Sequence, residues 1–264
     1  MTYELGLARG GVELKSFYRE RDQVVFTFAL PVVLLVLLGT VFDNVYPGTT
    51  VTSAHYMVPS MMAAGIASAT FLNLGTSIAA DRENGTLKRL RGLPMPMTSY
   101  VIGKVAVVLV VAVVQMALML AIGVLLFDLP LPADAGRWFT FGWVVLLGTV
   151  SCSLLGVAAS QAAMSASSAA TAMNMLHLVL AFLSGIYFTP ISTLPNVLVT
   201  IGSFFPLKWM GQGLRSAFLP DSILSVEMTN SWEHGRTALV LAAWCVGGLV
   251  LCLFALRWRA RRDG

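Results

Sequence analysis

Charged side chains are scarce in this sequence, since only 11% of its 264 residues are Asp, Glu, Lys or Arg while 57% are hydrophobic. A soluble domain commonly has about 25% charged residues, so this composition excludes an ordinary water-soluble fold. The mean hydropathy of +0.79 supports the same conclusion. We therefore expect an all-α integral membrane protein. The net charge of +4 does not indicate a nucleic-acid partner, because the position of the basic residues matters more than their sum.

Cysteine is also rare, and the three that occur, Cys152, Cys245 and Cys252, lie within apolar runs. An odd number of cysteines at membrane depth gives no support for a disulfide framework, so we expect them to serve as packing residues. The first two dozen residues are mixed and charged, and they lack the short apolar core of a signal peptide. The first apolar run is therefore expected to remain as an uncleaved span.

Motifs for nucleotide and metal chemistry are missing as well. No His-Glu-x-x-His occurs, which excludes that class of membrane metalloprotease. The nearest match to a phosphate-binding loop is Gly103-Lys104, but Thr98 stands where the motif requires glycine and Val105 where it requires serine or threonine. We expect the chain to hydrolyse no ATP by itself and to hold no cofactor or metal.

His177 lies inside an apolar run near Asn174, and an ionisable residue at membrane depth is a functional hypothesis by default. An intramembrane hydrolase that pairs His177 with Ser151, Ser153 or Ser184 is one alternative, although no serine stands in a Gly-x-Ser-x-Gly motif. A histidine without an acidic partner more often forms hydrogen bonds between helices. Both readings of His177 stay open at the level of the sequence.

Apolar runs long enough to cross a bilayer occur six times, given that a spanning helix needs about 20 residues. They cover approximately residues 24–42, 57–80, 101–127, 139–160, 170–188 and 237–256. Basic residues gather before the first run, after the second and after the last, which makes these segments cytoplasmic by the positive-inside rule. We predict six transmembrane helices with both termini in the cytoplasm.

Two further segments are expected to lie at the membrane surfaces. The segment 189–236 is longer than a turn requires, and its apolar stretch 197–205 is too short to span the membrane. This predicts re-entrant or interfacial helices on the outer face, with an ordinary loop that carries an apolar patch as the alternative. Residues 1–23 place Leu7 and Leu14 near one helical face, which predicts an interfacial helix, with a partly ordered tail as the alternative.

The stretch DRENGTLKRLRGLPMP, residues 81–96, gathers charge between the second and third apolar runs. Gly85 breaks its first polar turn, and Thr86 is placed to cap a short helix that ends near Pro94. A solvated basic loop accounts for the lysines and arginines. It does not account for the acidic pair, for the break at Gly85 or for the Pro-x-Pro. We therefore predict a short helix that presents charge to a partner.

Two stretches resemble the type-2 membrane subunits of ABC transporters, the permeases of bacterial drug, antibiotic and polysaccharide exporters. DRENGTLKRLRGLPMPMTSYVIGK is similar to the loop after the family's second span, and SGIYFTPISTLPNVLVTIGSFFPLKWMGQGLRSAF is similar to the segment that joins its last two spans. The resemblance implies one transmembrane domain over residues 1–264. Within it, 1–23 would form an interfacial connecting helix, 81–100 a cytoplasmic coupling loop and 189–236 an extracellular re-entrant segment.

The resemblance also implies a division of labour with a separate ATPase, which binds the ATP and Mg. Two permease chains, identical or closely related, and two ATPase chains would form the working unit in the inner membrane of a bacterial cell. The residues carried over as the ATPase-coupling contact are Asp81, Arg82, Glu83, Gly85, Thr86, Leu87 and Leu90.

Few ionisable groups lie in the apolar runs, which favours a hydrophobic or amphipathic cargo, such as a drug, an antibiotic or a lipid-linked molecule, over an ion. Methionine repacks readily around varied apolar shapes. The residues expected to line the path are Met61, Met62, Phe71, Asn73, Met116, Met119, Asn174 and His177. A permease for a polysaccharide, an intramembrane hydrolase and a non-transporting assembly subunit are the alternatives.

Overall fold

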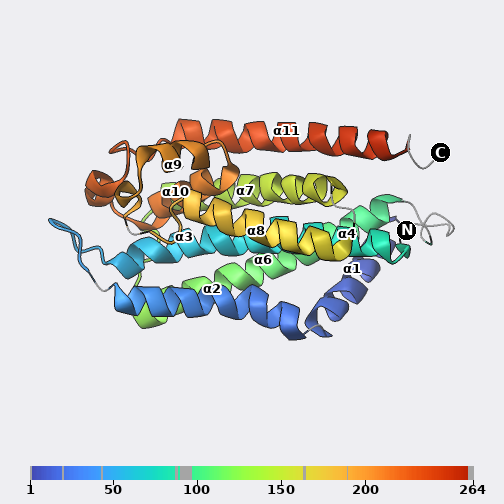
Figure 1. The fold of residues 1–264 in the computed structure, drawn as a ribbon. Coiled ribbons are helices and arrows are strands. Elements are labelled where there is room, and N and C mark those ends of the chain that lie inside the picture. The colour runs from blue at the N-terminus through green and yellow to red at the C-terminus, as the bar shows by residue number, and fades with distance from the viewer. Residues whose placement is uncertain are drawn as a thin grey trace.

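The computed structural model describes residues 2–19, 21–42, 44–86, 89, 97–162, 165–188 and 190–260, and most of them are helical. Within these ranges the β-type pairing is confined to one isolated bridge between Val45 and Thr52. Long helices lie side by side along one axis (Figure 1). The predicted all-α class is therefore confirmed for the described residues.

The helices follow one another with short connections. In chain order they are α1 (Thr2–Arg19), α2 (Arg21–Val41), α3 (Ser53–Ala67), the π-helical segment η1 (Ser68–Asn73), α4 (Leu74–Glu83), α6 (Met97–Phe127), α7 (Ala135–Ala162), α8 (Ala166–Leu183), η2 (Ile191–Thr193), α9 (Asn196–Gly202), α10 (Pro206–Phe218), η3 (Asp221–Val226) and α11 (His234–Ala260). The start of α1 and the end of α11 lie toward the same end of the bundle (Figure 1).

Five helical segments are long and apolar enough to cross a membrane. They are Ser53–Glu83, Ser99–Phe127, Ala135–Ala162, Ala166–Leu183 and His234–Cys252. They correspond to the second to sixth predicted runs. The first run forms α2, whose apolar part among the described residues, Thr27–Val41, is shorter than the other five. Several spans are thus confirmed, and the sixth stays a prediction.

The second predicted span is one helix that changes pitch in its middle, because η1 connects α3 directly to α4. A π-helical segment widens the backbone, and such segments are frequent at functional sites. α7 crosses here at Gly156, where a β-carbon would lie 2.5 Å from the carbonyl oxygen of Phe71. Only a residue without a side chain allows the two backbones to approach this closely.

The main apolar core lies where α3, α7 and α10 meet. Methionines from several helices are fully buried in it, among them Met57, Met61, Met62, Met119 and Met210. All residues of α10 are buried, against α3, α7 and α11. α10 is therefore part of the packed interior, whereas Val197 and Phe204 before it are exposed. Ion pairing of Arg215 on α10 with Glu227 after η3 fixes α10 in this interior.

Candidate functional site

The last turn of α4 carries the acidic and basic residues Asp81, Arg82 and Glu83, which the sequence marks as unusual. Asp81 faces α6: its Oδ2 accepts a hydrogen bond of 2.9 Å from the Tyr100 hydroxyl and lies 2.6 Å from Lys104 Nζ. The side chain of Asp81 is about one-fifth exposed. Its carboxylate is thus committed to contacts within the chain.

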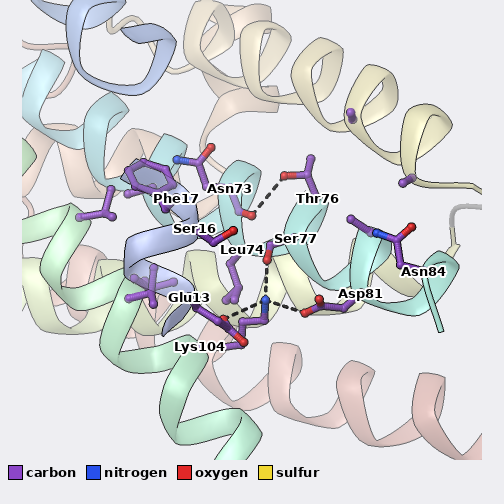
Figure 2. Close-up of a pocket in the computed structure, with 17 residues that line it drawn as sticks. Glu13, Ser16, Phe17, Asn73, Leu74, Thr76, Ser77, Asp81, Asn84 and Lys104 are labelled. Carbon is purple, nitrogen blue, oxygen red and sulfur yellow. Dashed lines mark hydrogen bonds and ion pairs between the residues drawn. The ribbon is translucent and has the colours of Figure 1, made fainter. Parts of the chain in front are cut away.

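Lys104 joins three helices at this point (Figure 2). Its ammonium lies 3.0 Å from Glu13 Oε2 on α1 and donates a hydrogen bond of 2.5 Å to Ser77 Oγ on α4, besides pairing with Asp81. These contacts use all three donors of an ammonium group. The residue is only 6% exposed, so the pairing with two carboxylates offsets the cost of burying its charge.

The contact between α1 and α6 depends on glycines. A β-carbon on Gly103 would lie 3.2 Å from the backbone nitrogen of Gly10, and one on Gly10 would lie 3.3 Å from the Gly103 carbonyl oxygen. Glycine lets two helices approach at backbone distance. Glu13, one turn further along α1, is thereby held within reach of Lys104. It also accepts a hydrogen bond of 3.1 Å from Arg9 Nε.

Arg82 and Glu83 face two other helices. Arg82 Nη1 donates a hydrogen bond of 2.7 Å to the carbonyl oxygen of Ser160, in the last turn of α7. The Glu83 carboxylate accepts a hydrogen bond from the backbone nitrogen of Ala166, the first residue of α8. Three consecutive side chains thus connect the end of α4 to α6, α7 and α8.

The helix ends directly after this triplet, as the sequence predicts. Asn84 follows as the C-cap, and Gly85 has a φ of +70°, in the left-handed region that glycine adopts without strain. Gly85 N donates a hydrogen bond of 3.2 Å to the Arg82 carbonyl oxygen. Thr86 is half-buried. Arg89 N donates a hydrogen bond of 3.0 Å to the Gly85 carbonyl oxygen, whereas Leu87 and Leu90 of the predicted short helix lie outside the described residues.

A polar cavity of about 460 Å³ lies beside Lys104 and its partners Glu13, Ser77 and Asp81 (Figure 2). α1, η1, α4, α6 and α8 all contribute to its wall. Its polar lining includes Ser16, Asn73, Thr76, Ser77 and Asn84. The cavity therefore offers hydroxyl and amide groups next to one lysine and two carboxylates.

A larger apolar groove of about 1010 Å³ lies between α2, α3, η1 and α8. Its lining is mainly aliphatic and aromatic, with a few polar groups that include Thr27, Asn174 and His177. Asn73, Thr76 and Ala170 line both the groove and the polar cavity. The two spaces therefore adjoin at the level of η1 and the start of α4.

The predicted path residues separate into two groups. Met61, Asn73, Asn174 and His177 line the apolar groove. Met61 is also part of the core, as are Met62, Phe71 and Met119, and Met116 packs against it. The structure brings the first group together around one space and leaves the second group in the packing between helices.

No catalytic arrangement surrounds His177 within the described residues. Ser151 donates its hydroxyl to the Gly148 carbonyl oxygen at 3.1 Å, within its own helix, and no hydrogen bond joins it to His177. Over the same part of the chain, no group of three His, Cys, Asp or Glu side chains is placed to hold a metal ion. The three cysteines are free, and two of them are buried.

The sequence assigned Lys104 no role beyond its positive charge and its place in Gly103-Lys104, the end of the stretch that resembles the family's loop. It assigned no role to Glu13 or Tyr100. Lys104 is a charged residue close to the start of a long apolar run, which is a signal that such a residue is paired. The identity of its partners depends on the docking of α1 against α6, which hydropathy does not reveal.

Comparison of the sequence with known protein families identifies the family of this chain. Residues 11–219 match the family described as ABC-2 type transporter. This match spans most of the chain, so the protein belongs to that family. It is a multi-pass membrane protein and, as a member of this family, the membrane subunit of an ABC transporter.

Two similar proteins illustrate the family. The chain is 24% identical over 207 residues to "Putative transport permease YvfS" of Bacillus subtilis (strain 168). The aligned segment covers 76% of this chain and 80% of that protein. It is 25% identical over 177 residues to "Probable multidrug ABC transporter permease YbhR" of Escherichia coli (strain K12), which covers 67% of this chain and 47% of that protein. The matched segment thus spans less than half of YbhR.

Proposed function

We propose that this chain is the permease subunit of an ATP-driven exporter that moves hydrophobic or amphipathic molecules, such as drugs, antibiotics or lipid-linked compounds, out of the cell. The observation that carries the proposal is the junction of the apolar groove with the polar cavity at Asn73 and Thr76. The two adjoining spaces together extend from the charged end of α4 to the apolar walls of α2 and α8. Such a space suits a cargo that has both a polar and an apolar part.

A cytoplasmic ATPase would supply the energy and would dock on the loop 81–100. The support is the exposure of Glu83 and Asn84 at the end of α4 and the break at Gly85, which ends that helix. The name of YbhR also describes an ABC transporter permease. Of the seven residues that the sequence assigns to this contact, Asp81, Arg82 and Glu83 bind α6, α7 and α8 within the chain, which leaves Gly85, Thr86, Leu87 and Leu90 for the ATPase. ATP and Mg would bind to the ATPase and not to this chain.

The proposed topology has six spans with both termini in the cytoplasm of a bacterial cell, α2 being the first span. The basic residues beside α1, after α4 and at the end of α11 support this direction. α9 and α10 would form a re-entrant pair on the outer side, because α10 is fully buried and too short to cross. α1 would lie at the inner surface, packed on α6.

The working unit would contain two permease chains, identical or closely related. The groove is open along α2 and α8, whose outward side chains include Leu30, Met175, Leu178 and Phe182. A second copy facing this groove would shield these apolar groups from the aqueous cargo path. Crosslinking of a single-cysteine variant, Met175→Cys, across two chains would test this arrangement.

The decisive experiment is co-expression of the chain with the ATP-binding-cassette protein encoded beside it, followed by reconstitution in vesicles. We expect the two proteins to copurify and to move ethidium or a fluorescent phospholipid only when ATP is present. A fluorescent oligosaccharide serves as the comparison cargo. Transport of the oligosaccharide alone would favour the polysaccharide permease, and absence of any ATP-dependent transport would contradict the proposal.

His177 separates the proposed permease from the intramembrane hydrolase. As a groove residue without a hydrogen bond in the described structure, it is expected to tolerate alanine with transport changed by about threefold or less. A hydrolase would lose its activity with His177→Ala even without any ATPase. Peptide and ester cleavage by the purified chain, compared with that of the variant, is the measurement.

A further inference from the structure

We infer that Arg82 and Glu83 are positioning residues that fasten α7 and α8 to the end of α4, so that α8 follows the loop which the ATPase moves. The inference rests on the proposed function and gives these two residues a role inside the chain. α8 is one wall of the apolar groove. A displacement of the loop would thus reach the cargo path through a direct contact.

The charges of the two side chains suit the helix ends that they meet. The Arg82 guanidinium binds a carbonyl oxygen in the last turn of α7, where a helix carries partial negative charge. The Glu83 carboxylate binds the first backbone N–H of α8, where a helix carries partial positive charge. Hydrogen bonds with an ionised partner are stronger than neutral ones. Both ends of the connection between α7 and α8 are therefore attached to one turn of α4.

The start of α8 is organised to receive this contact. Ser165 Oγ accepts a hydrogen bond of 3.2 Å from Ser168 N, and Ser168 Oγ accepts one of 3.0 Å from Ser165 N. This reciprocal capping satisfies one of the first amides of the helix. Glu83 satisfies another, that of Ala166. The first turn of α8 is thus capped from within and bound to the end of α4.

α8 is able to transmit the displacement along its length. It continues without a break from Ala166 to Leu183, and Asn174, His177 and Phe182 on it line the groove. At 1.5 Å per residue, His177 lies about 16 Å along the helix from Ala166. Asp81 meanwhile ties the same turn to α6 and α1 through Lys104. The triplet therefore joins the loop to both sides of the cavity.

The first test uses Glu83→Ala and Glu83→Gln in the complex with the ATPase. Glu83→Gln keeps an acceptor oxygen and loses the charge, whereas Glu83→Ala loses both. We expect both variants to copurify with the ATPase in normal amounts. ATP-dependent ethidium transport should fall about tenfold for alanine, the usual effect of losing one charge-assisted bond, and less for glutamine. Asp128→Asn, an exposed acid in the connection between α6 and α7, is the matched control and should transport normally.

The second test replaces the bond by a covalent link. Glu83→Cys with Ala166→Cys, in a chain whose three native cysteines are alanine, should transport poorly and recover when a short bismaleimide joins the two thiols. A purely local structural defect would not recover. Recovery supports the inference, and failure of the linked protein to recover overturns it.

A third measurement needs no cargo. The thiol of Met175→Cys, in the groove, should change its labelling rate when ATP and vanadate trap the ATPase, and Glu83→Ala should abolish that change. If the proposed export fails for every probe but this response is seen, the inference survives while the proposed function does not. The inference is overturned if Glu83→Ala prevents copurification, leaves transport intact or keeps the labelling response.

Discussion

Arg215 and Glu227 form a two-point ion pair in the interior of the bundle, between α10 and the segment after η3. Arg215 Nε lies 2.6 Å from Glu227 Oε1, and Nη2 donates a hydrogen bond of 3.2 Å to Oε2, with both side chains almost fully buried. Nη1 donates a hydrogen bond of 3.1 Å to Ser60 Oγ, and the Tyr56 hydroxyl donates one of 3.0 Å to Glu227 Oε1. α10, the segment after η3 and α3 thus share one satisfied polar network.

Arg215→Met is expected to destabilise the protein by about 3 kcal/mol or more, because it leaves the Glu227 carboxylate buried without its partner. The double variant Arg215→Met, Glu227→Gln should be less destabilised than the single one, since no uncompensated charge remains. Thermal unfolding of the purified protein in detergent measures both. Arg236→Met is the control, because Arg236 is 72% exposed and should contribute little. Equal losses for Arg215→Met and Arg236→Met would contradict the assignment.

Lys104→Met is expected to cost about 2 kcal/mol of stability, because Asp81 then loses its cationic partner in a partly buried site and Glu13 keeps only Arg9. The effect should be local to the contact of α1 with α6. Hydrogen exchange of peptides from Thr2–Arg19 should become faster, while peptides from α11 should not change. Adding Asp81→Asn to Lys104→Met should recover part of the loss. A uniform rise in exchange would instead indicate general unfolding.

Gly156→Ala is expected to destabilise the protein by about 1–3 kcal/mol, as overpacking does. The added carbon would lie 2.5 Å from the Phe71 carbonyl oxygen, so α7 and η1 must move apart. Gly142→Ala in the same helix is the matched control, because a β-carbon there meets nothing within 4 Å. Its stability should stay within about 0.5 kcal/mol of the parent. If both variants melt at the same temperature, the close approach at Gly156 is wrong.

Lys208 predicts a pH dependence of stability. Burial lowers the pKa of Lys208 to about 8, and attraction by Glu233 opposes this only in part. The ordinary pKa of lysine is about 10.4, so between these values the unfolded chain holds a proton that the folded chain has released. The free energy of unfolding therefore rises with pH across this window. Below pH 8, the folded protein bears the full cost of burying the charged Lys208 ammonium.

The measurement is the melting temperature of the parent and of Lys208→Met from pH 7 to 10. The melting temperature of the parent should rise relative to that of the variant as the pH rises, because methionine has no proton to lose. Lys15→Met, at an exposed position on α1, controls for general effects of removing a lysine. If the melting temperatures of the parent and of Lys208→Met change in parallel with pH, the lowered pKa of Lys208 is contradicted.

Much of the fold follows from hydropathy alone. The apolar runs 57–80 and 101–127 correspond to the helical segments Ser53–Glu83 and Ser99–Phe127, because length and apolarity are sufficient to identify a spanning helix. Gly85 also ends its helix as expected, with the positive φ that glycine supplies. The π-helical turn at Ser68–Asn73 had no signal in the sequence, since it arises where α7 packs against the helix.

The candidate site was predictable in location and not in detail. The charge pattern of residues 81–83 marked the end of α4, yet it gave no indication that each side chain faces a different helix. The methionines show the same limit. Met61 and Met62 both lie in the core, but of the two only Met61 also lines the groove, although they are neighbours of identical chemistry. Hydropathy records that a side chain is apolar and does not record which surface it meets.

The sequence by itself determined the membrane environment, the helical class, the approximate helix limits and the family, because these depend on composition, on run length and on short local patterns. Only the tertiary structure decided the partners of Lys104, Arg82 and Glu83, the burial of α10 and the junction of the polar cavity with the apolar groove. These features depend on contacts between residues as far apart as Glu13 and Lys104, or Glu83 and Ala166. Such contacts exist only after the helices have packed.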